Sequence, residues 1–476
     1  MKLKQKTING IKWTTLSTVV TTTLQFLQLL ILARFLEPSE FGLMTLVSLT
    51  IGFSKVFLDV GISNAIIHKQ DITDIQLSTL YWINIIAGII LFFLLLLIAP
   101  FIALFYNEPN LTSLILLLSI TFLIQPFGQQ FMMLWQKEMR FDEIAYIHIL
   151  TKFVTLSVSV IYAYYGYGVY SLVLGALAGT ITQTFQLMYK GLKEYKPLFV
   201  FEISNVKEFL SFGFYQMGEN VINYFNSQMD VILIGKLLGT EALGIYYIAK
   251  QIIMKPLQII NPIILKVAFP LMAKLQDKDK ELKKIYLQII NYIASINFPI
   301  YIFFIIFAKE IVLFIFGEKW LVSVPIIEIL SIYGAFRSLG NPIGSLLLAK
   351  GKANWGFWWN FGLLFYIPIV IIITSKWGLL GISWGFVFVI ISLIVPNWYF
   401  LVKNLCFAKF IEYHKNIFIP FLITIFSGLV VYFVIGFIDT IFIKFIVSIF
   451  LGTSLLIILH YIFNKQFLFS IREFIS

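Results

Sequence analysis

Charge is scarce in this sequence: Asp, Glu, Lys and Arg make up only 12% of its 476 residues. Soluble domains carry about 25% charged residues and about 45–50% apolar ones. Here hydrophobic residues reach 59%, and the mean hydropathy is +0.91. Such a chain has too little polar surface for a soluble enzyme. The composition therefore predicts an all-α integral membrane protein with many spans.

Cysteine and histidine are scarce as well. The lone Cys406 excludes a disulfide framework and any cysteine-based metal cluster. The histidines are scattered and never fall at a metal-ligand spacing: His68, His148, His414 and His460. The sequence also lacks a P-loop Gly-Lys-Ser/Thr, and Ser, His and Asp never cluster. We therefore expect no enzyme, no ATPase motor, no metal and no cofactor.

The net charge of +11 at pH 7 raises the question of a nucleic-acid partner. The lysines lie mainly in the connections between apolar segments, where they set membrane topology. We therefore expect no nucleic-acid partner. No outer connection is long enough to fold as a domain, which argues against a membrane-bound polymerase, ligase or glycosyltransferase.

A helix needs about 20 apolar residues to cross the hydrocarbon core of a bilayer. The sequence predicts fourteen transmembrane helices, which begin near Trp13, Phe41, Tyr81, Leu111, Tyr146, Tyr170, Phe209, Leu243, Tyr286, Val322, Trp355, Leu379, Ile417 and Phe442. If the N-terminus is cytoplasmic, few basic residues fall on the opposite side: Arg34, Lys236, Lys309, Lys319 and Lys376. This asymmetry predicts that both termini are cytoplasmic.

The two halves repeat at an offset of 202 residues, so that Arg34 aligns with Lys236 and Gly42 with Gly244. In the first span, polar residues at steps of four and three lie on one helical face: Thr14, Thr18, Thr21, Gln25 and Gln28. The offset yields a second stripe: Gln216, Asn220, Asn223, Ser227 and Asp230, widened by Glu219 and Asn226. A looser repeat, offset by 212, links Gln125, Gly128 and Gln129 to Arg337, Gly340 and Asn341.

This repeat predicts two parallel six-helix lobes and two further helices, as in secondary transporters with a substrate site near the midplane. The N-terminal lobe would be residues 1–200, the C-terminal lobe 201–405, and the extra spans 406–476. We expect a water-filled cavity lined by both stripes, chiefly by Gln25, Gln28, Gln216, Asn223 and Asn226. The alternative, in which these side chains hydrogen-bond between helices and hold the bundle together, stays open. Gly175 and Gly179 form a GxxxG pair, which predicts close helix packing.

Charged residues within spans mark cavities or partners, because each is costly in the bilayer. The interior is net basic, and Lys250, Lys255 and Arg337 have no acidic neighbour at helical spacing. These cations are the first candidates for an anionic ligand, and Arg337 suits bidentate phosphate contact. Lys55 and Lys152 are the second candidates, although Lys55 and Asp59 are also spaced to neutralise each other. The candidates for ion or proton coupling are Asp59, Glu219 and Asp230.

Several segments resemble a known family. Residues 33–42 (ARFLEPSEFG) are similar to the AR-x-L-x-P-x-x-F/Y-G signature of Wzx-type polysaccharide flippases. Residues 59–67 (DVGISNAII) resemble their D-x-G-x-x-x-A segment. In the second half, residues 230–235, 243–246 and 267–270 resemble the branch that includes colanic and teichuronic acid exporters. The resemblance covers roughly residues 1–400.

The resemblance implies the multidrug/oligosaccharidyl-lipid/polysaccharide exporter superfamily, with two six-helix lobes, two C-terminal helices and alternating access. The implied substrate is an undecaprenyl-pyrophosphate-linked oligosaccharide, moved across a bacterial cytoplasmic membrane for cell-surface polysaccharide biosynthesis. The implied partners are this lipid-linked oligosaccharide, membrane lipids and a polysaccharide polymerase or assembly machinery, with coupling to a proton or Na⁺ gradient. A multidrug/cation antiporter and a peptidoglycan-precursor flippase of the same superfamily remain alternatives.

Overall fold

The computed structural model describes the chain except for residues 1–2, 59–65, 67–71, 466 and 468–476. Within the described part, the secondary structure is helical throughout, which confirms the all-α prediction. The first half contains α1 (Leu3–Phe35), α2 (Pro38–Leu58), α4 (Asp74–Tyr106), α5 (Asn110–Ser119), α6 (Thr121–Ile124), α7 (Pro126–Lys137), α8 (Phe141–Tyr164) and α9 (Tyr170–Glu194). The long α10 (Lys207–Lys274) follows. The remainder contains α11 (Asp279–Ile306), α12 (Ala308–Ile315), α13 (Val324–Arg337), α14 (Asn341–Ala349), α15 (Ala353–Thr374), α16 (Gly378–Ser392), α17 (Ile394–Pro396), α18 (Lys403–Cys406), α19 (Phe410–Ile435) and α20 (Ile441–Phe463).

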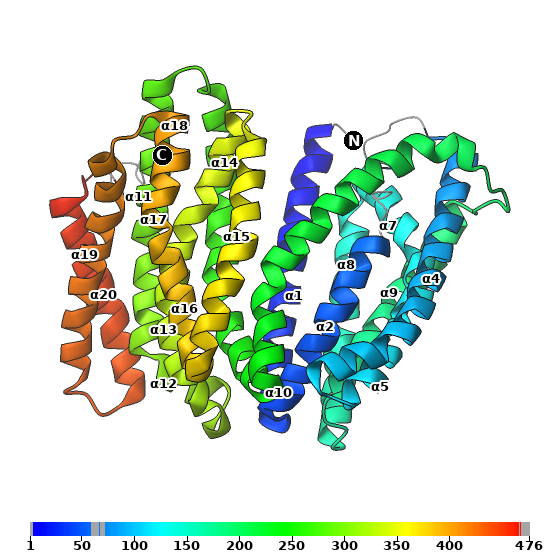
Figure 1. Cartoon of the computed structure of the whole chain (residues 1–476), viewed down its shortest axis with the longest axis horizontal. Helices are drawn as coiled ribbons and strands as arrows, with labels where there is room; N and C mark the ends of the chain where they lie inside the picture. Colours follow the sequence, from blue (N-terminus) through cyan, green and yellow to red (C-terminus); the bar gives the residue numbers. More distant parts are fainter. Residues whose placement is uncertain (1–2, 59–65, 67–71, 466, 468–476) are drawn as a thin grey trace. The chain divides into compact units, whose positions relative to one another are not determined.

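The chain forms two compact units, Met1–Gly244 and Ile245–Ser476. In the first unit, α8 packs against both α1 and α9 (Figure 1). In the second, α19 packs against α11, and α20 lies beside α19 as an antiparallel hairpin. The lobe boundaries expected after residues 200 and 405 stay predictions.

Within the described residues, ten helices are long and apolar enough to cross a membrane, or eleven if the bent pair Asn110–Ile124 and Pro126–Lys137 is one span. Two of the ten, Asn220–Lys274 and Asn354–Cys406, contain 55 and 53 residues. At about 1.5 Å per residue each could cover roughly 80 Å, far more than the ~30 Å of a hydrocarbon core. The structure thus shows a multi-pass helical membrane protein, with fewer candidate spans than the fourteen predicted.

A break divides α10 into two helices. Gly239 has φ 83° and ψ −177° inside α10, a conformation open essentially only to glycine. Glu37, which lies 202 residues earlier, occupies the turn between α1 and α2. The chain therefore breaks at equivalent positions in the two halves, as the repeat predicts.

The looser repeat also coincides with helix breaks. Gln125 separates α6 from α7, and its counterpart Arg337 ends α13, after which a 3₁₀ turn (Ser338–Gly340) leads into α14. A proline follows soon after each break, Pro126 in α7 and Pro342 in α14. Proline is tolerated in the first helical turn, where its missing N–H would have no intrahelical partner.

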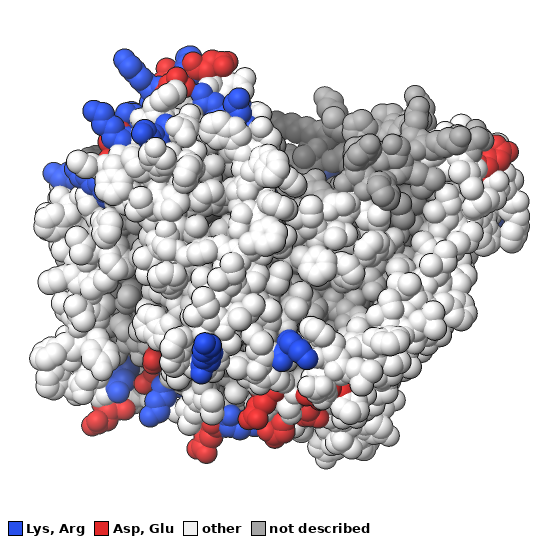
Figure 2. Space-filling view, in the orientation of Figure 1, with Lys and Arg blue, Asp and Glu red and all other residues white. Residues whose placement is uncertain are grey.

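Charged side chains of the second unit gather at its two ends, with an uncharged zone between them (Figure 2). At one end, Lys350 Nζ lies 2.8 Å from Asp279 Oδ1, and Lys283 Nζ lies 3.1 Å from Glu412 Oε2. These pairs join the start of α11 to the end of α14 and the start of α19. Lys283 and Lys350 are among the basic residues that the sequence places on the predicted cytoplasmic side.

Candidate functional site

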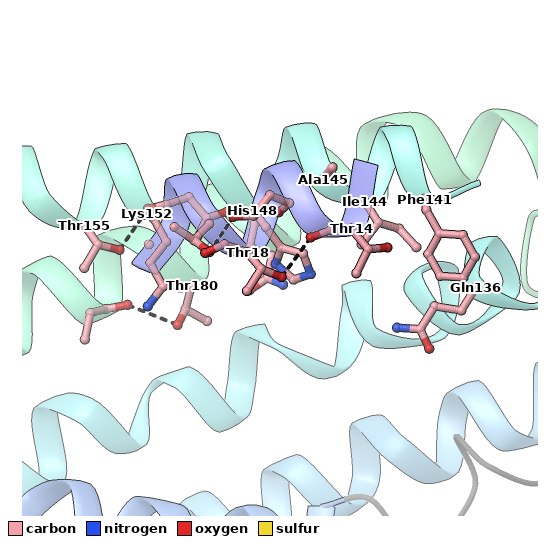
Figure 3. Close-up of a pocket in the computed structure, with 16 residues that line it drawn as sticks. Thr14, Thr18, Gln136, Phe141, Ile144, Ala145, His148, Lys152, Thr155 and Thr180 are labelled. Carbon is pink, nitrogen blue, oxygen red and sulfur yellow. Dashed lines mark hydrogen bonds between the residues drawn. The ribbon is translucent and has the colours of Figure 1, made fainter. Parts of the chain in front are cut away.

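A cavity of about 550 Å³ lies within the first unit, between α1, α7, α8 and α9 (Figure 3). Apolar atoms come from Phe141, Ile144 and Ala145. The polar residues of its wall are Thr14, Ser17, Thr18, Thr21, Gln136, His148, Thr151, Lys152, Thr155, Thr180 and Gln183. The volume lies in the range of small-molecule sites, which is about 300–1,000 Å³.

Helical periodicity explains how α1 and α8 present these groups. On α8, His148, Lys152 and Thr155 follow at steps of four and three, which places them on one face of the helix (Figure 3). Threonine hydroxyls in such helices donate to carbonyls four residues earlier: Thr18 to Thr14 (2.8 Å) and Thr155 to Thr151 (2.9 Å). Their oxygens keep free lone pairs, so these hydroxyls can still accept hydrogen bonds from a ligand.

Close packing of α8 and α9 forms one side of the cavity. A Cβ at Gly175 would overlap the hydroxyl of Ser159, and one at Gly179 would overlap the hydroxyl of Thr155. Both glycines therefore allow the two helices to approach, which confirms the packing role predicted for the GxxxG pair. Gly179 also lines the cavity.

The charge of the wall is positive. Lys152 lines the cavity, and no Asp or Glu is among the described residues that do so. Lys55, in the last turn of α2, is near enough to repel Lys152 as a like charge. Two lysines that repel each other favour an anion nearby, since it would relieve their repulsion and replace lost hydration.

The first polar stripe divides into two parts. Thr14, Thr18 and Thr21 line the cavity. Gln28 instead donates a hydrogen bond to Ser159 Oγ of α8 at 3.0 Å, which is the interhelical role left open by the sequence. Gln25 is exposed and lies outside the cavity wall.

The second stripe lies on α10. Asn223 is exposed, Asn226 is half-buried and Asp230 is buried, with Oδ1 accepting from the N–H of Val231 at 2.9 Å. The side chains of Gln216 and Glu219 lie outside the described part of the structure, as does Asp59.

The cations that the sequence ranked first lie in the second unit. Lys250 and Lys255 are half-buried on α10, and the Lys250 Nζ lies 5.8 Å from the centre of the Tyr246 ring. Arg337 is exposed, and its Nη1 lies 3.5 Å from Asn341 Oδ1. Both contacts are with residues four positions away along the chain.

Sequence analysis missed most of the α8 and α9 side of the cavity. His148, Thr151, Thr155, Thr180 and Gln183 were not singled out, although Lys152 was. The signal was present: His148, Lys152, Thr155 and Ser159 repeat the step of four, three and four residues seen in the first span.

An ion-pair cluster adjoins one end of the cavity wall, where Gln136 and Phe141 lie. Arg140 contacts both Glu194 oxygens at 2.6 and 2.8 Å and also pairs with Glu143. Trp135 Nε1 donates to Glu194 at 3.0 Å. The hydrogen bond from Arg140, and secondarily that from Trp135, lowers the pKa of the Glu194 carboxyl. The cluster fixes the turn between α7 and α8 to the end of α9.

The sequence of this chain is similar to those of known proteins. Residues 31–325 match a family described as "Polysaccharide biosynthesis protein". The chain is 34% identical to the teichuronic acid biosynthesis protein TuaB of Bacillus subtilis, over 90% of this chain and 89% of that protein. It is 32% identical to the lipopolysaccharide biosynthesis protein WzxC of Escherichia coli, over 92% and 89%.

Among solved structures, the fold is similar to that of the lipid II flippase MurJ in an inward closed conformation. The TM-score is 0.78, with 16% sequence identity, over 96% of this chain and 100% of that one. At this identity the likeness shows the fold alone.

Proposed function

Because this chain belongs to the polysaccharide biosynthesis protein family of membrane transporters, we propose that it moves a lipid-linked oligosaccharide across the bacterial cytoplasmic membrane. The proposed substrate is an undecaprenyl-pyrophosphate-linked repeat unit, and the proposed mechanism is alternating access. The cationic, hydroxyl-lined cavity of the first unit is the observation that carries this proposal.

The chemistry of the cavity suits such a substrate. A pyrophosphate is anionic, and Lys152, with Lys55 nearby, supplies positive charge. The glycan is rich in hydroxyls, which Thr14, Thr18 and Gln183 can meet with hydrogen bonds. The polyprenyl tail is apolar and would stay in lipid.

We assign the pyrophosphate to Lys152 and Lys55 first. Lys250, Lys255 and Arg337 stay a second proposal, since they are the interior cations that the sequence singled out first. A charge-assisted hydrogen bond contributes about 1.5–3 kcal/mol, which corresponds to roughly ten- to a hundredfold in affinity.

Fourteen spans with both termini in the cytoplasm remain our proposal for the topology. The break at Gly239 supports two crossings in α10, and Asn354–Cys406 is long enough for two more. The 25 residues of α9 are enough for another.

Transport against a gradient requires an energy source, and we propose a proton or Na⁺ gradient. The candidates are Asp230, which is buried on α10, together with Asp59 and Glu219. A polymerase or assembly machinery remains the proposed protein partner, because the translocated units must then be joined.

A multidrug/cation antiporter is the main alternative. A cavity for cationic drugs favours acidic walls, whereas the described lining residues here contain no carboxylate. A peptidoglycan-precursor flippase is a second alternative, because its substrate has a similar headgroup. The experiment described below distinguishes it from the proposed function.

The test is outer-leaflet delivery of lipid-linked glycan in cells whose own gene copy is deleted. We expect Lys152→Gln to reduce delivery strongly, Lys152→Glu to reduce it further, and Lys152→Arg to retain more of it, while glycan synthesis continues. The combined variant Lys250→Gln, Lys255→Gln and Arg337→Gln tests the second set of cations. Normal delivery by Lys152→Gln with loss in the triple variant would move the anion site to the second unit.

The same cells separate the alternative substrates. Rescue of peptidoglycan synthesis, with no effect on the surface polysaccharide, would favour the peptidoglycan-precursor flippase. Drug resistance that depends on the chain, without glycan delivery, would favour the antiporter.

A further inference from the structure

Two equivalent turns of the repeat cross each other in the first unit. A Cβ at Gly42 would overlap the carbonyl oxygen of Thr240, and a Cβ at Gly244 would overlap the carbonyl oxygen of Pro38. Gly42 and Gly244 differ by 202 residues, and so do Pro38 and Thr240. The contacts are therefore reciprocal, as expected if a local pseudo-twofold axis passes between the two glycines.

The crossing is dry, and backbone meets backbone there. Phe41, Gly42, Thr240, Leu243 and Gly244 are all buried. At the two glycines themselves no side chains interlock, so the two backbones are in direct contact there. This differs from ordinary helix packing, in which side chains interdigitate.

Hydrogen bonds at the edge of the crossing hold it closed. Lys236 Nζ donates to the carbonyl of Phe105 at 2.6 Å, and Thr240 Oγ1 donates to Glu108 Oε1 at 2.7 Å. These bonds tie the second half of the repeat to the turn between α4 and α5. These two bonds are exposed or only partly buried, so breaking each of them would cost only a modest free energy.

The crossing lies beyond the C-terminal end of α1, whereas the cavity lies along the middle of that helix. The cavity is lined by Thr14 to Thr21, and the crossing follows the end of α1 at Phe35. Fourteen residues of helix between Thr21 and Phe35 correspond to about 21 Å. A substrate that enters the cavity at one end of the unit must pass the other end to leave on the opposite side.

We propose that the reciprocal crossing of Gly42 and Gly244 is the seal that closes the first unit at the end beyond the C-terminus of α1, and that it parts during each transport cycle. The inference rests on the proposed transport function. Glycine is required at both positions because any side chain would wedge the closed seal apart.

A wedge should shift the protein toward the open seal. The readout is a cysteine at Thr18 in the cavity, introduced after Cys406→Ala removes the native thiol, and labelled from outside with a membrane-impermeant reagent. We expect Gly42→Ala, and independently Gly244→Ala, to increase external labelling. Overpacking of this kind shifts an equilibrium by roughly 5- to 150-fold.

Gly218→Ala is the matched control, because Gly218 lies on the same α10 and has nothing within 4 Å of its Cβ position. It should leave labelling unchanged. Equal labelling in Gly42→Ala, Gly244→Ala and the control would overturn the proposal.

A second experiment keeps both glycines. Glu108→Cys and Thr240→Cys, joined by a short, reducible bifunctional thiol reagent, should stop glycan delivery, and reduction of the linker should restore it. Full delivery of glycan with the linker in place would show that the crossing stays closed throughout transport, and it would overturn the proposal. If external labelling changes in Gly42→Ala while no lipid-linked glycan is moved by the unmodified protein, the seal stands and the proposed substrate fails.

Discussion

Arg140 holds both carboxylate oxygens of Glu194, at 2.6 and 2.8 Å, and so joins the start of α8 to the end of α9 across 54 residues of sequence. The pair lies beside Gln136 and Phe141, which line the cavity. The geometry is bidentate, the arrangement in which arginine and carboxylate bind most specifically.

We expect Arg140→Gln to loosen this joint, because Glu194 and Glu143 would lose their shared cation. The pair is partly exposed, at 26% for Arg140 and 44% for Glu194, so the cost should be about 1 kcal/mol or less. Thermal unfolding in detergent measures it. Glu138→Gln is the control, since Glu138 is 59% exposed and its contact with Arg140 is longer, at 3.4 Å; an equal loss there would argue against a special role for Glu194.

The same pair makes stability depend on pH. The pKa of Glu194 is lowered in the folded protein, chiefly by Arg140. The ionised carboxylate therefore stabilises the fold above the unfolded-state pKa of about 4.3, and this stabilisation is lost as the pH falls through the folded-state pKa. We expect the stability difference between the unmodified protein and Glu194→Gln to shrink below about pH 4. A difference that stays constant from neutral to acid pH would contradict this.

The division of the first polar stripe predicts different reactivities. Cysteines at Thr18 and Gln25 should react with a polar thiol reagent, because one lines the cavity and the other is exposed. A cysteine at buried Val231 should not.

Gln28→Ala should remove the hydrogen bond to Ser159, which should lower the free energy of unfolding by about 0.5–1.5 kcal/mol. Thermal unfolding measures this loss, and unchanged stability would show that the bond contributes nothing.

Reporter fusions test the proposed topology. Fusions after Ser39, Tyr164 and Thr240 should report an external location, and those after Lys193, Lys280 and Ser476 a cytoplasmic one. A cytoplasmic signal after Thr240 would mean that Gly239 does not form an external turn between two spans, and the parallel repeat would fail.

A buried polar cluster anchors α20 to α11. The Asn464 amide lies 3.0 Å from Asn291 Oδ1 and 3.1 Å from His460 Nδ1. Asn464→Ala would leave both acceptors buried without this donor, at a cost of about 1–3 kcal/mol. Thermal unfolding measures the loss, and Asn404→Ala, an exposed asparagine bonded only to nearby carbonyls, should cost less. Equal losses would contradict the anchoring role.

Local pattern was enough to predict several features of this protein. The helical class followed from the apolar composition, since an unpaired backbone cannot face lipid. The face shared by Thr14, Thr18 and Thr21 followed from a period of 3.6 residues. Separate spans beginning near Phe209 and Leu243 were predicted as well, and the break at Gly239 lies between these two positions. Each of these depends on neighbours in sequence or on a copy of the same segment.

Tertiary structure alone decided which polar groups meet. Gln25 and Gln28 belong to the same stripe, yet Gln28 finds Ser159, 131 residues away, while Gln25 is exposed. Likewise, Lys55 and Lys152 belong to helices far apart in sequence but lie near enough to repel each other. A cavity exists only where helices fail to fill the space between them, so its position depends on packing between distant segments, which no periodicity within one helix encodes.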